Sequence, residues 1–270
     1  MRVQAHAAGI GEGLSMSRQA IIEALLAARL SGEKLNSYPG PTPSSMAEAF
    51  AIQSAVRTAM SWTHAGWKIG CTSERAQKAL HTDGPFPGPL YRERVFASGA
   101  HVQTLPSNSR TTEPEIAFTM ANDLPARGEA WSVDEVLSTV ATVHPAIEIV
   151  NPRLPKGFND VVEWYVADGG LSHALVLGGG TKPPGRADLA KITNRVVING
   201  QNKYTGLGAN ALGGPELALT WLANDLIKKG LFLRGGDIVT TGVITEVFDT
   251  QIGDHVEAAY DLIGKVSVQL

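Results

Sequence analysis

The spacing of apolar residues in the first quarter of the chain predicts two amphipathic helices. In residues 17–32 and 45–60, apolar side chains recur at steps of three and four residues, which places them on one helical face. The second segment also carries a capping-box signature, because Glu48 follows Ser45 by three residues. We therefore expect residues 17–62 to form a helical N-terminal subdomain.

From residue 63 onwards the pattern changes to short apolar runs separated by Gly and Pro clusters, which is typical of β-strands. Two more helices are predicted in this region, one between Ser132 and Pro145 and one from Pro215 to Lys229. Because the strands outnumber the helices and do not alternate regularly with them, we expect an α+β fold with residues 63–270 as a β-rich body. The predicted strands are 66–70, 113–120, 146–151, 174–178, 194–199, 238–242 and 255–260.

Composition places the chain among ordinary globular proteins and excludes some classes of partner. Of its 270 residues, 43% are hydrophobic and 18% are charged. The formal net charge of -3 supplies no basic surface for nucleic acid. No apolar run reaches the roughly 18 residues of a membrane-spanning helix. We therefore expect neither a nucleic acid nor a membrane as a partner.

Two features of the sequence bear on its cellular compartment. Residues 1–16 lack the apolar stretch of a secretory signal, so we expect a loose leader there. Cys71 is the lone cysteine, which excludes an intramolecular disulfide framework and a multi-cysteine zinc site. Both features predict a reducing, cytoplasmic location. No motif of a cysteine nucleophile surrounds Cys71, so we expect a small packed side chain.

Two glutamates share one face of a predicted strand. Glu113 and Glu115 are two residues apart in the segment 113–120, so an extended backbone points both side chains to the same side. Neighbouring carboxylates repel each other unless a cation or a shared proton lies between them. Two interpretations are open here: a cation site, or a solvated pair on an edge strand, which Pro114 would permit.

A third carboxylate lies in the middle of a strongly apolar strand. Glu148 stands between Ile147 and Ile149, where an unpaired ionised carboxylate is costly. Three carboxylates around one cation form a ligand set suited to Mg²⁺ or Mn²⁺, with about three octahedral positions left for water and substrate. The alternative for Glu148 is an ion pair with an arginine such as Arg153.

Lys68 is the third candidate for chemistry. It lies between Trp67 and Ile69 on a short strand bounded by glycines, so we expect it to be partly desolvated. Desolvation lowers the pKa of a lysine and suits it to proton transfer or carboxylate binding. The alternative is that the side chain reaches out to solvent along its apolar stem.

Six short motifs occur in a recognisable order. They are GWKIG at 66–70, EPEIAF at 113–118, DLP at 123–125, PAIE at 145–148, VAD at 166–168 and GGDIVTTG at 235–242. From about Ala47 to its C-terminus, the chain resembles the 2-keto-4-pentenoate (2-hydroxypenta-2,4-dienoate) hydratases and the related 4-oxalocrotonate decarboxylases of the fumarylacetoacetate hydrolase superfamily. The ordered combination is specific for the superfamily and less so for the reaction.

The resemblance implies a fold and a site. The fold is a helical N-terminal part on a mixed β-roll or β-barrel-like body of the fumarylacetoacetate hydrolase C-terminal type. The substrate is a small 2-oxo or 2-hydroxydienoic acid whose 1-carboxylate and 2-oxygen chelate the metal. Lys68 lies near this substrate as a catalytic residue, and Asp168 and Thr245 fall at positions that help line the site. The implied ligands of the Mg²⁺ or Mn²⁺ ion are Glu113, Glu115 and Glu148.

Two lyase reactions fit such a site. In a hydratase, ketonisation of the dienol gives an enone, and water adds at C4 with Lys68 or an oriented water assisting proton transfer. In a decarboxylase, a similar dienolate follows the loss of CO₂ from a 2-oxo-3-enedioate. A cation that bridges the two substrate oxygens would stabilise both dienolates. We expect hydration to a 4-hydroxy-2-oxo acid, as in aromatic compound catabolism, with decarboxylation as the alternative.

The chain departs from the hydratase pattern at three places. Hydratases of this family commonly carry an acidic residue in a Pro-Asp-Phe-Gly segment, and Phe86 stands there in this chain. Phe86 cannot exchange a proton, so it is a candidate substrate contact, and the nearby Asp83 is a candidate catalytic acid or base. Gly169-Gly170 replaces the usual Asn-Ala. Phe86 and Thr245-Glu246 are more typical of the decarboxylases.

Two further functions and an assembly state stay open. An acylpyruvate C–C hydrolase would need a separate base, commonly a His–Glu pair on a lid, which the sequence does not reveal. A non-catalytic protein that binds 2-oxo acids would have kept the metal site and lost the acid and base. The resemblance also implies a homo-oligomer, and a complex with a related decarboxylase or hydratase is a further option.

Overall fold

The computed structural model describes residues 18–105 and 109–270, so the predicted leader and the start of the first helix at Ser17 lie outside the described residues. Residues 18–31 form a helix. The other elements, in chain order, are α2 (Met46–Ala59), β1 (His64–Gly70), α3 (Glu74–Leu80), β2 (Phe86–Tyr91), η1 (Arg92–Arg94), β3 (Val95–Ala97), β4 (Ala100–His101), β5 (Thr111–Met120), α4 (Val133–Ser138), β6 (Val140–Val150), α5 (Val162–Ala167), η2 (Gly169–Leu171), β7 (Ser172–Leu177), α6 (Arg186–Leu189), β8 (Thr193–Ile198), β9 (Gln201–Leu207), η3 (Gly208–Asn210), α7 (Pro215–Lys228), β10 (Ile238–Val243), β11 (Phe248–Asp249), β12 (His255–Tyr260) and β13 (Gly264–Gln269).

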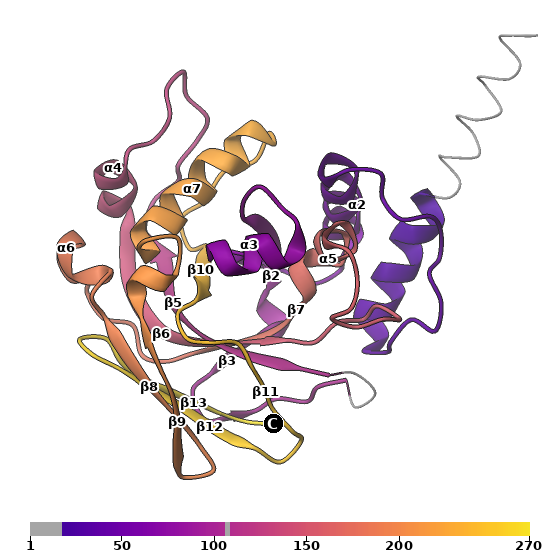
Figure 1. Cartoon of the computed structure of the whole chain (residues 1–270). Helices are drawn as coiled ribbons and strands as arrows, with labels where there is room; N and C mark the ends of the chain where they lie inside the picture. Colours follow the sequence, from indigo (N-terminus) through magenta and orange to yellow (C-terminus); the bar gives the residue numbers. More distant parts are fainter. Residues whose placement is uncertain (1–17, 106–108) are drawn as a thin grey trace, which may run out of the picture.

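Two β-sheets form the body of the molecule (Figure 1). The larger sheet has the strand order β2-β1-β10-β5-β6-β7-β3, and β11 pairs with β5 off this path. β1 and β10 run parallel, whereas β10, β5, β6 and β7 are successively antiparallel. The smaller sheet has the order β4-β13-β12-β8-β9. The predicted α+β fold with a mixed β-sheet body is confirmed.

The main hydrophobic core joins the two sheets and α7. Ile116 of β5, Val256 of β12 and Leu222 of α7 belong to one continuous buried cluster. Where β12 packs against β6, the Tyr260 hydroxyl donates a hydrogen bond to the Ala146 carbonyl over 2.9 Å. β5 therefore lies inside the body, with β10 and β6 on its two sides.

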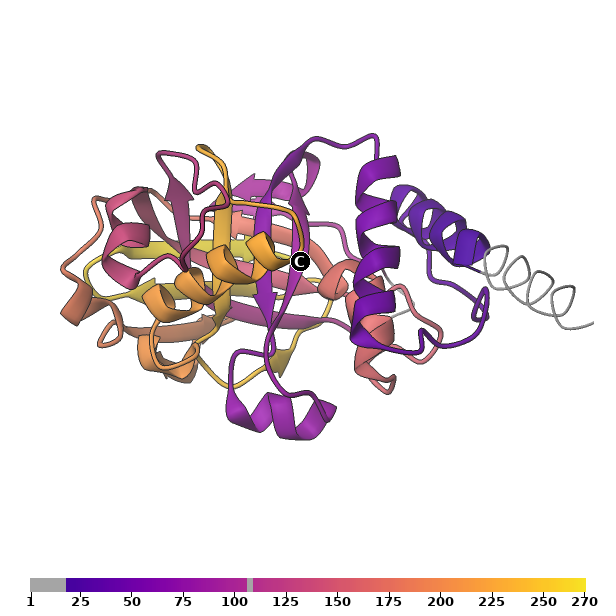
Figure 2. The same ribbon diagram turned by 90° about the horizontal axis from the view of Figure 1, so that it is seen from above.

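The N-terminal helix, α2 and α5 pack together at one end of the molecule, as the two perpendicular views show (Figures 1 and 2). Ser45 caps α2 by accepting a hydrogen bond from the Glu48 backbone N–H over 3.2 Å. The Glu48 carboxylate accepts from the backbone and hydroxyl of Ser44 instead of closing the capping box. Ile52 of α2 and Trp164 of α5 share the apolar cluster that attaches this end to the body.

The prediction of a helix between Ser132 and Pro145 is wrong over most of this segment. The capping box of Ser132 and Glu135 is present, but α4 ends at Ser138 and β6 begins at Val140. The β-branched side chains at the start of β6 favour an extended backbone, and the strand gains a full ladder of hydrogen bonds with β5. A helical signature at the N-terminus therefore did not determine how far the helix runs.

The seven predicted strands are present as β1, β5, β6, β7, β8, β10 and β12. α7 begins at Pro215, and Gly230 follows its end with a φ of 73°, a conformation that glycine adopts without strain. In the part of the chain that the structure describes, no helix combines the length and the apolar character needed to cross a membrane.

Candidate metal centre and substrate cavity

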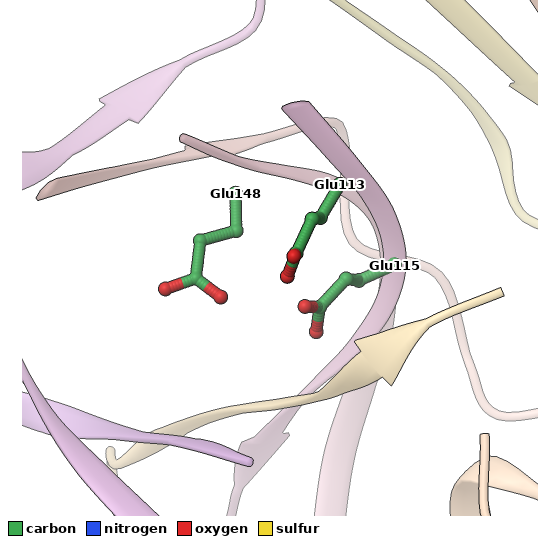
Figure 3. A group of neighbouring side chains, drawn as sticks. All are labelled: Glu113, Glu115 and Glu148. Carbon is green, nitrogen blue, oxygen red and sulfur yellow. The ribbon is translucent and has the colours of Figure 1, made fainter. Parts of the chain in front are cut away.

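Three glutamate side chains converge at the middle of the larger sheet (Figure 3). Glu113 and Glu115 are on the same face of β5, and Glu148 of β6 is the direct cross-strand partner of Glu113. One carboxylate oxygen from each glutamate can be chosen so that all three lie within 4.8 Å of one another. The sequence prediction that these three side chains share one place is confirmed.

The cluster is shielded from solvent. Glu115 and Glu148 are fully buried, and Glu113 is half-buried. Burial raises the pKa of Glu113 to about 7, and the Glu148 carboxylate adds to the rise while Lys68 opposes it. Burial and the two neighbouring carboxylates hold the pKa of Glu115 well above its usual value. The alternative of a solvated pair on an edge strand is wrong, because β5 is an interior strand.

The unused oxygens of this cluster fit a hard divalent cation. Oε2 of Glu115 accepts a hydrogen bond from the Gly242 backbone N–H over 2.7 Å, while its Oε1 has no hydrogen-bond partner. Oε1 of Glu148 also has none. Buried carboxylate oxygens without partners are costly, and three carboxylates are the ligand type that Mg²⁺ and Mn²⁺ prefer. The donor set therefore has both the chemistry and the spare oxygens that such an ion needs.

Lys68 of β1 reaches this cluster from a neighbouring part of the sheet. Its Nζ lies 3.0 Å from Oε2 of Glu148, an ion pair whose alignment is not that of a hydrogen bond. The side chain is only 4% exposed, so the alternative of a solvent-reaching lysine is wrong. Burial alone lowers the pKa of Lys68, but the attraction of Glu148, Glu113 and Glu115 outweighs it and raises the pKa. The predicted lowering is therefore wrong in direction.

Two glycines leave room for the stem of Lys68. A Cβ at Gly170 would lie 3.0 Å from Lys68 Cδ, and one at Gly88 would lie 3.1 Å from the same atom. The backbone of Gly170 also has a φ of 68°, a value that residues with a side chain rarely adopt. At Gly170 the departure thus leaves space for the buried lysine stem, whereas a Cβ at Gly169 would lie 2.7 Å from Nη2 of Arg29.

A cavity of about 420 Å³ opens beside the cluster. Lys68 and Glu113 are on its wall, and so is Phe86, the residue predicted to contact substrate. Burial raises the pKa of the Cys71 thiol on the same wall to about 11, which keeps it protonated near neutral pH. The described residues on the wall are Lys68, Ile69, Gly70, Cys71, Thr72, Ser73, Ala76, Leu80, Phe86, Thr111, Glu113, Val150, Phe158, Tyr165, Gly170, Leu171, Gly242, Val243, Val247 and Asp249.

Asp168 is buried beneath this wall and is not among its residues. Arg153 donates from Nε to Asp168 Oδ1 over 2.7 Å, and Nη2 of Arg29 lies 3.6 Å from the same oxygen. Both arginines also donate to the carbonyls of Asp168 and Ser172. This network holds the turn that contains Gly170, and Arg153 pairs with Asp168 rather than with Glu148. Sequence patterns did not reveal Arg29, which comes from the N-terminal helix.

The structure does not bring Thr245 or Asp83 to the cluster. Thr245 is half-buried, lines a neighbouring cavity and donates a hydrogen bond to the Glu246 carbonyl over 2.8 Å. Asp83 is exposed in the loop before β2 and lines neither cavity. Leu80 of α3, Phe158 and Tyr165 of α5 were missed by the sequence analysis, because two short helices and one turn bring them to the cavity.

Comparisons with known proteins agree with the fold and with the family that the sequence resembles. The family model for the fumarylacetoacetate (FAA) hydrolase C-terminal region matches residues 85–270. A 2-hydroxyhexa-2,4-dienoate hydratase of Comamonas testosteroni is 28% identical over 253 residues, which is 93% of this chain and 95% of the relative. A 2-keto-4-pentenoate hydratase of Paraburkholderia xenovorans is 31% identical over 225 residues, or 82% of each chain.

Among solved structures, 4-oxalocrotonate decarboxylase from Pseudomonas putida G7, complexed with magnesium and adipate, has the same fold. It superposes with a TM-score of 0.84 at 24% identity, and the match covers 94% of this chain and 97% of the decarboxylase.

Proposed function

The chain belongs to the fumarylacetoacetate hydrolase family, and on this premise we propose that it is a divalent-metal-dependent lyase. Its proposed reaction is the hydration of a 2-hydroxypenta-2,4-dienoate-type acid to a 4-hydroxy-2-oxo acid. The observation that carries the proposal is the convergence of three buried carboxylates and one buried lysine beside a cavity. The names of the hydratase relatives support the choice of reaction.

In this proposal Glu113, Glu115 and Glu148 hold an Mg²⁺ or Mn²⁺ ion. When bound, the ion supplies Lewis-acid stabilisation for negative charge on the 2-oxygen and the 1-carboxylate of the substrate. The carboxylate oxygens without partners support this assignment, as does the hydrogen bond from Gly242, which orients Glu115.

Hydration adds one water to the dienol. The proton of the 2-hydroxyl leaves, C5 takes a proton, and the chain becomes an enone with a C3–C4 double bond. The water oxygen then bonds to C4, and C3 takes a proton. We assign proton exchange with the substrate to Lys68, because its Nζ is next to the cluster and its side chain is on the cavity wall. Asp83 is exposed and receives no role in this scheme.

Decarboxylation of a 2-oxo-3-enedioate is the second candidate. The C5–C6 bond would break, CO₂ would leave, and its electron pair would form the dienolate of the same 2-oxygen. Its support is the resemblance of Phe86 to the decarboxylase pattern, because an apolar ring stands on the cavity wall where the hydratases commonly carry an acid. The other two functions have less support. Of the described wall residues none is a histidine, which a C–C hydrolase would use.

Product analysis tests the proposed function. Protein with Mg²⁺ is incubated separately with 2-hydroxypenta-2,4-dienoate, 2-oxohex-3-enedioate and an acylpyruvate, and EDTA is the control. We expect 4-hydroxy-2-oxopentanoate from the first. Release of CO₂ from the second alone would replace hydration with decarboxylation, and pyruvate from the third would indicate C–C hydrolysis. Oxalate binding that Glu115→Gln abolishes, without turnover of any substrate, would indicate a non-catalytic protein.

Location and assembly complete the proposal. A cytoplasmic enzyme is supported by the lone cysteine, Cys71. A homo-oligomer, and a complex with a related decarboxylase or hydratase, stay predictions of the family resemblance. Size-exclusion chromatography with light scattering measures the first, and co-purification of the two proteins tests the second.

A further inference from the structure

The cavity has a largely apolar wall beyond the metal centre. Its larger side chains apart from Lys68 and Glu113 include Leu80, Phe86, Phe158 and Tyr165. The Tyr165 hydroxyl is already bonded within the protein, because it donates to the Phe158 carbonyl over 2.6 Å and accepts from a backbone N–H over 3.1 Å. These side chains offer contact area to an apolar group and no charge to a polar one.

The charges around the cavity are strongly unbalanced. Lys68 is the one cation among the described residues of the wall, and it is paired with Glu148 at 3.0 Å. The wall itself also carries the carboxylates of Glu113 and Asp249. A divalent ion at the centre would offset the glutamates and then bind the 1-carboxylate of the substrate. No cation of the described wall is left for a second carboxylate.

The two arginines nearest in sequence to wall residues do not line the substrate cavity. Arg75 of α3 is exposed and lines the neighbouring cavity, together with Glu246. Arg110 precedes Thr111 of the wall, but its guanidinium donates to the carbonyls of Leu105 and Thr250. Neither arginine is on the wall of the substrate cavity.

We propose, on the premise of the proposed function, that this site selects monocarboxylates with an uncharged, apolar tail and rejects dicarboxylates. A second carboxylate at the end of the tail would lose its hydration against Leu80, Phe86 and Phe158 without gaining a cation. It would also be repelled by Asp249. The names of the relatives leave this choice open, because 2-hydroxyhexa-2,4-dienoate has one carboxylate and 4-oxalocrotonate has two.

A matched pair of substrates tests the proposal. 2-Hydroxyhexa-2,4-dienoate and 2-hydroxyhexa-2,4-dienedioate differ only in a methyl or a carboxylate at C6. We expect kcat/KM with Mg²⁺ to favour the methyl compound by about 100-fold, counting any consumption of the dioate by hydration or CO₂ release. Equal or faster consumption of the dioate would overturn the proposal.

Substitutions show whether the lack of a second cation on the cavity wall causes the rejection of dicarboxylates. Leu80→Arg places a cation on the wall and is expected to raise kcat/KM for the dioate by about tenfold, whereas Leu80→Gln, which is polar and uncharged, is not. Arg75→Gln is expected to leave the ratio of the kcat/KM values for the two substrates unchanged. A folded Leu80→Arg protein with no gain, or an Arg75→Gln protein that loses dioate turnover, would contradict the proposal.

A binding measurement separates this proposal from the proposed function. 2-Oxohexanoate and 2-oxohexanedioate lack the conjugated double bonds, so their binding with Mg²⁺ can be followed by thermal shift without turnover. We expect the monocarboxylate to stabilise the protein more. That result, without turnover of any dienoate, would remove the proposed function and leave the tail selectivity standing. Equal or stronger stabilisation by the dioate would overturn the proposed selectivity. A result in which neither compound stabilises the protein would also overturn it.

Discussion

Glu113 and Glu148 lie directly opposite each other on the antiparallel strands β5 and β6. Like charges at directly opposed positions destabilise a sheet, and here Glu115 adds a third carboxylate within reach. Lys68 compensates the charge of Glu148, and burial raises the pKa of Glu113 and Glu115, so that the cost of their charges is felt as a tendency to bind protons. The arrangement is therefore poorly balanced by the protein alone and becomes favourable when a divalent cation is bound.

Glu113→Gln should make the free energy of unfolding much less dependent on Mg²⁺. In EDTA we expect the variant to be at least as stable as the wild type, because removing a facing charge gains up to about 1 kcal/mol. With Mg²⁺ at about 100 times its Kd, the wild type should gain roughly 2.7 kcal/mol and the variant much less. Thermal melts with EDTA and with Mg²⁺ measure both effects. The control is Glu129→Gln, an exposed loop residue that should respond to Mg²⁺ as the wild type does.

Lys68→Met should remove activity, whereas Asp83→Asn should not. Methionine keeps the length of the buried stem and loses the ammonium next to Glu148, so we expect kcat to fall by at least about 100-fold. Asp83 is exposed and off the cavity wall, so its variant should stay within about twofold of the wild type. Initial rates with 2-hydroxypenta-2,4-dienoate check both. A large loss in Asp83→Asn would return this residue to the mechanism.

Asp168→Asn should destabilise the fold far more than a surface substitution of the same type. It leaves the buried guanidinium groups of Arg153 and Arg29 without their counter-charge, at a cost of about 3 kcal/mol or more. Asp134→Asn breaks an exposed pair with Arg186 and should cost less than about 1 kcal/mol. Urea denaturation measures the two free energies of unfolding. Similar values would mean that the buried network does not hold the Gly170 turn.

His173 should make the protein sensitive to acid. Burial lowers its pKa to about 3, while its Nε2 lies 2.7 Å from the Gln103 carbonyl. The unfolded chain binds a proton at a pKa near 6.5, so this histidine's contribution is fully present above that pH. The stability lost grows as the pH falls towards 3 and reaches about 2 kcal/mol at pH 5.

Comparison with His173→Gln tests that contribution. Between pH 7 and pH 5 the free energy of unfolding should fall less in the variant than in the wild type, and the difference should be about 2 kcal/mol. His101→Gln, at an exposed position, is the control and should follow the wild type. Parallel pH profiles for His173→Gln and the wild type would refute the assignment.

The sequence was most informative where a polar residue interrupts an apolar pattern. The two-residue spacing of Glu113 and Glu115 predicted a shared face, and the cost of burying Glu148 predicted a partner for it. Strands with clear alternation were found for the same reason. The role of these carboxylates as metal ligands, and the boundary of the N-terminal subdomain at residue 62, stay predictions.

Features that depend on distant contacts escaped sequence analysis. β2 reads FPGPLY, a turn-like composition, yet its prolines are tolerated because it is the outermost strand of its sheet. The direction of the Lys68 pKa depends on carboxylates from β5 and β6, and the packing of Asp168 depends on Arg29 from a helix 139 residues earlier. Such relationships require the fold, because no local spacing encodes them.

In the proposed function the three glutamates form the metal centre of a hydratase, and one rate measurement tests this assignment most directly. Protein stripped with EDTA is assayed for loss of 2-hydroxypenta-2,4-dienoate while Mg²⁺ is added back, for the wild type and for Glu115→Gln. We predict no hydration without metal, saturable recovery in the wild type, and at least a roughly 100-fold lower rate in the variant at the same Mg²⁺. A full rate in EDTA, or a wild-type rate in Glu115→Gln, would contradict the assignment.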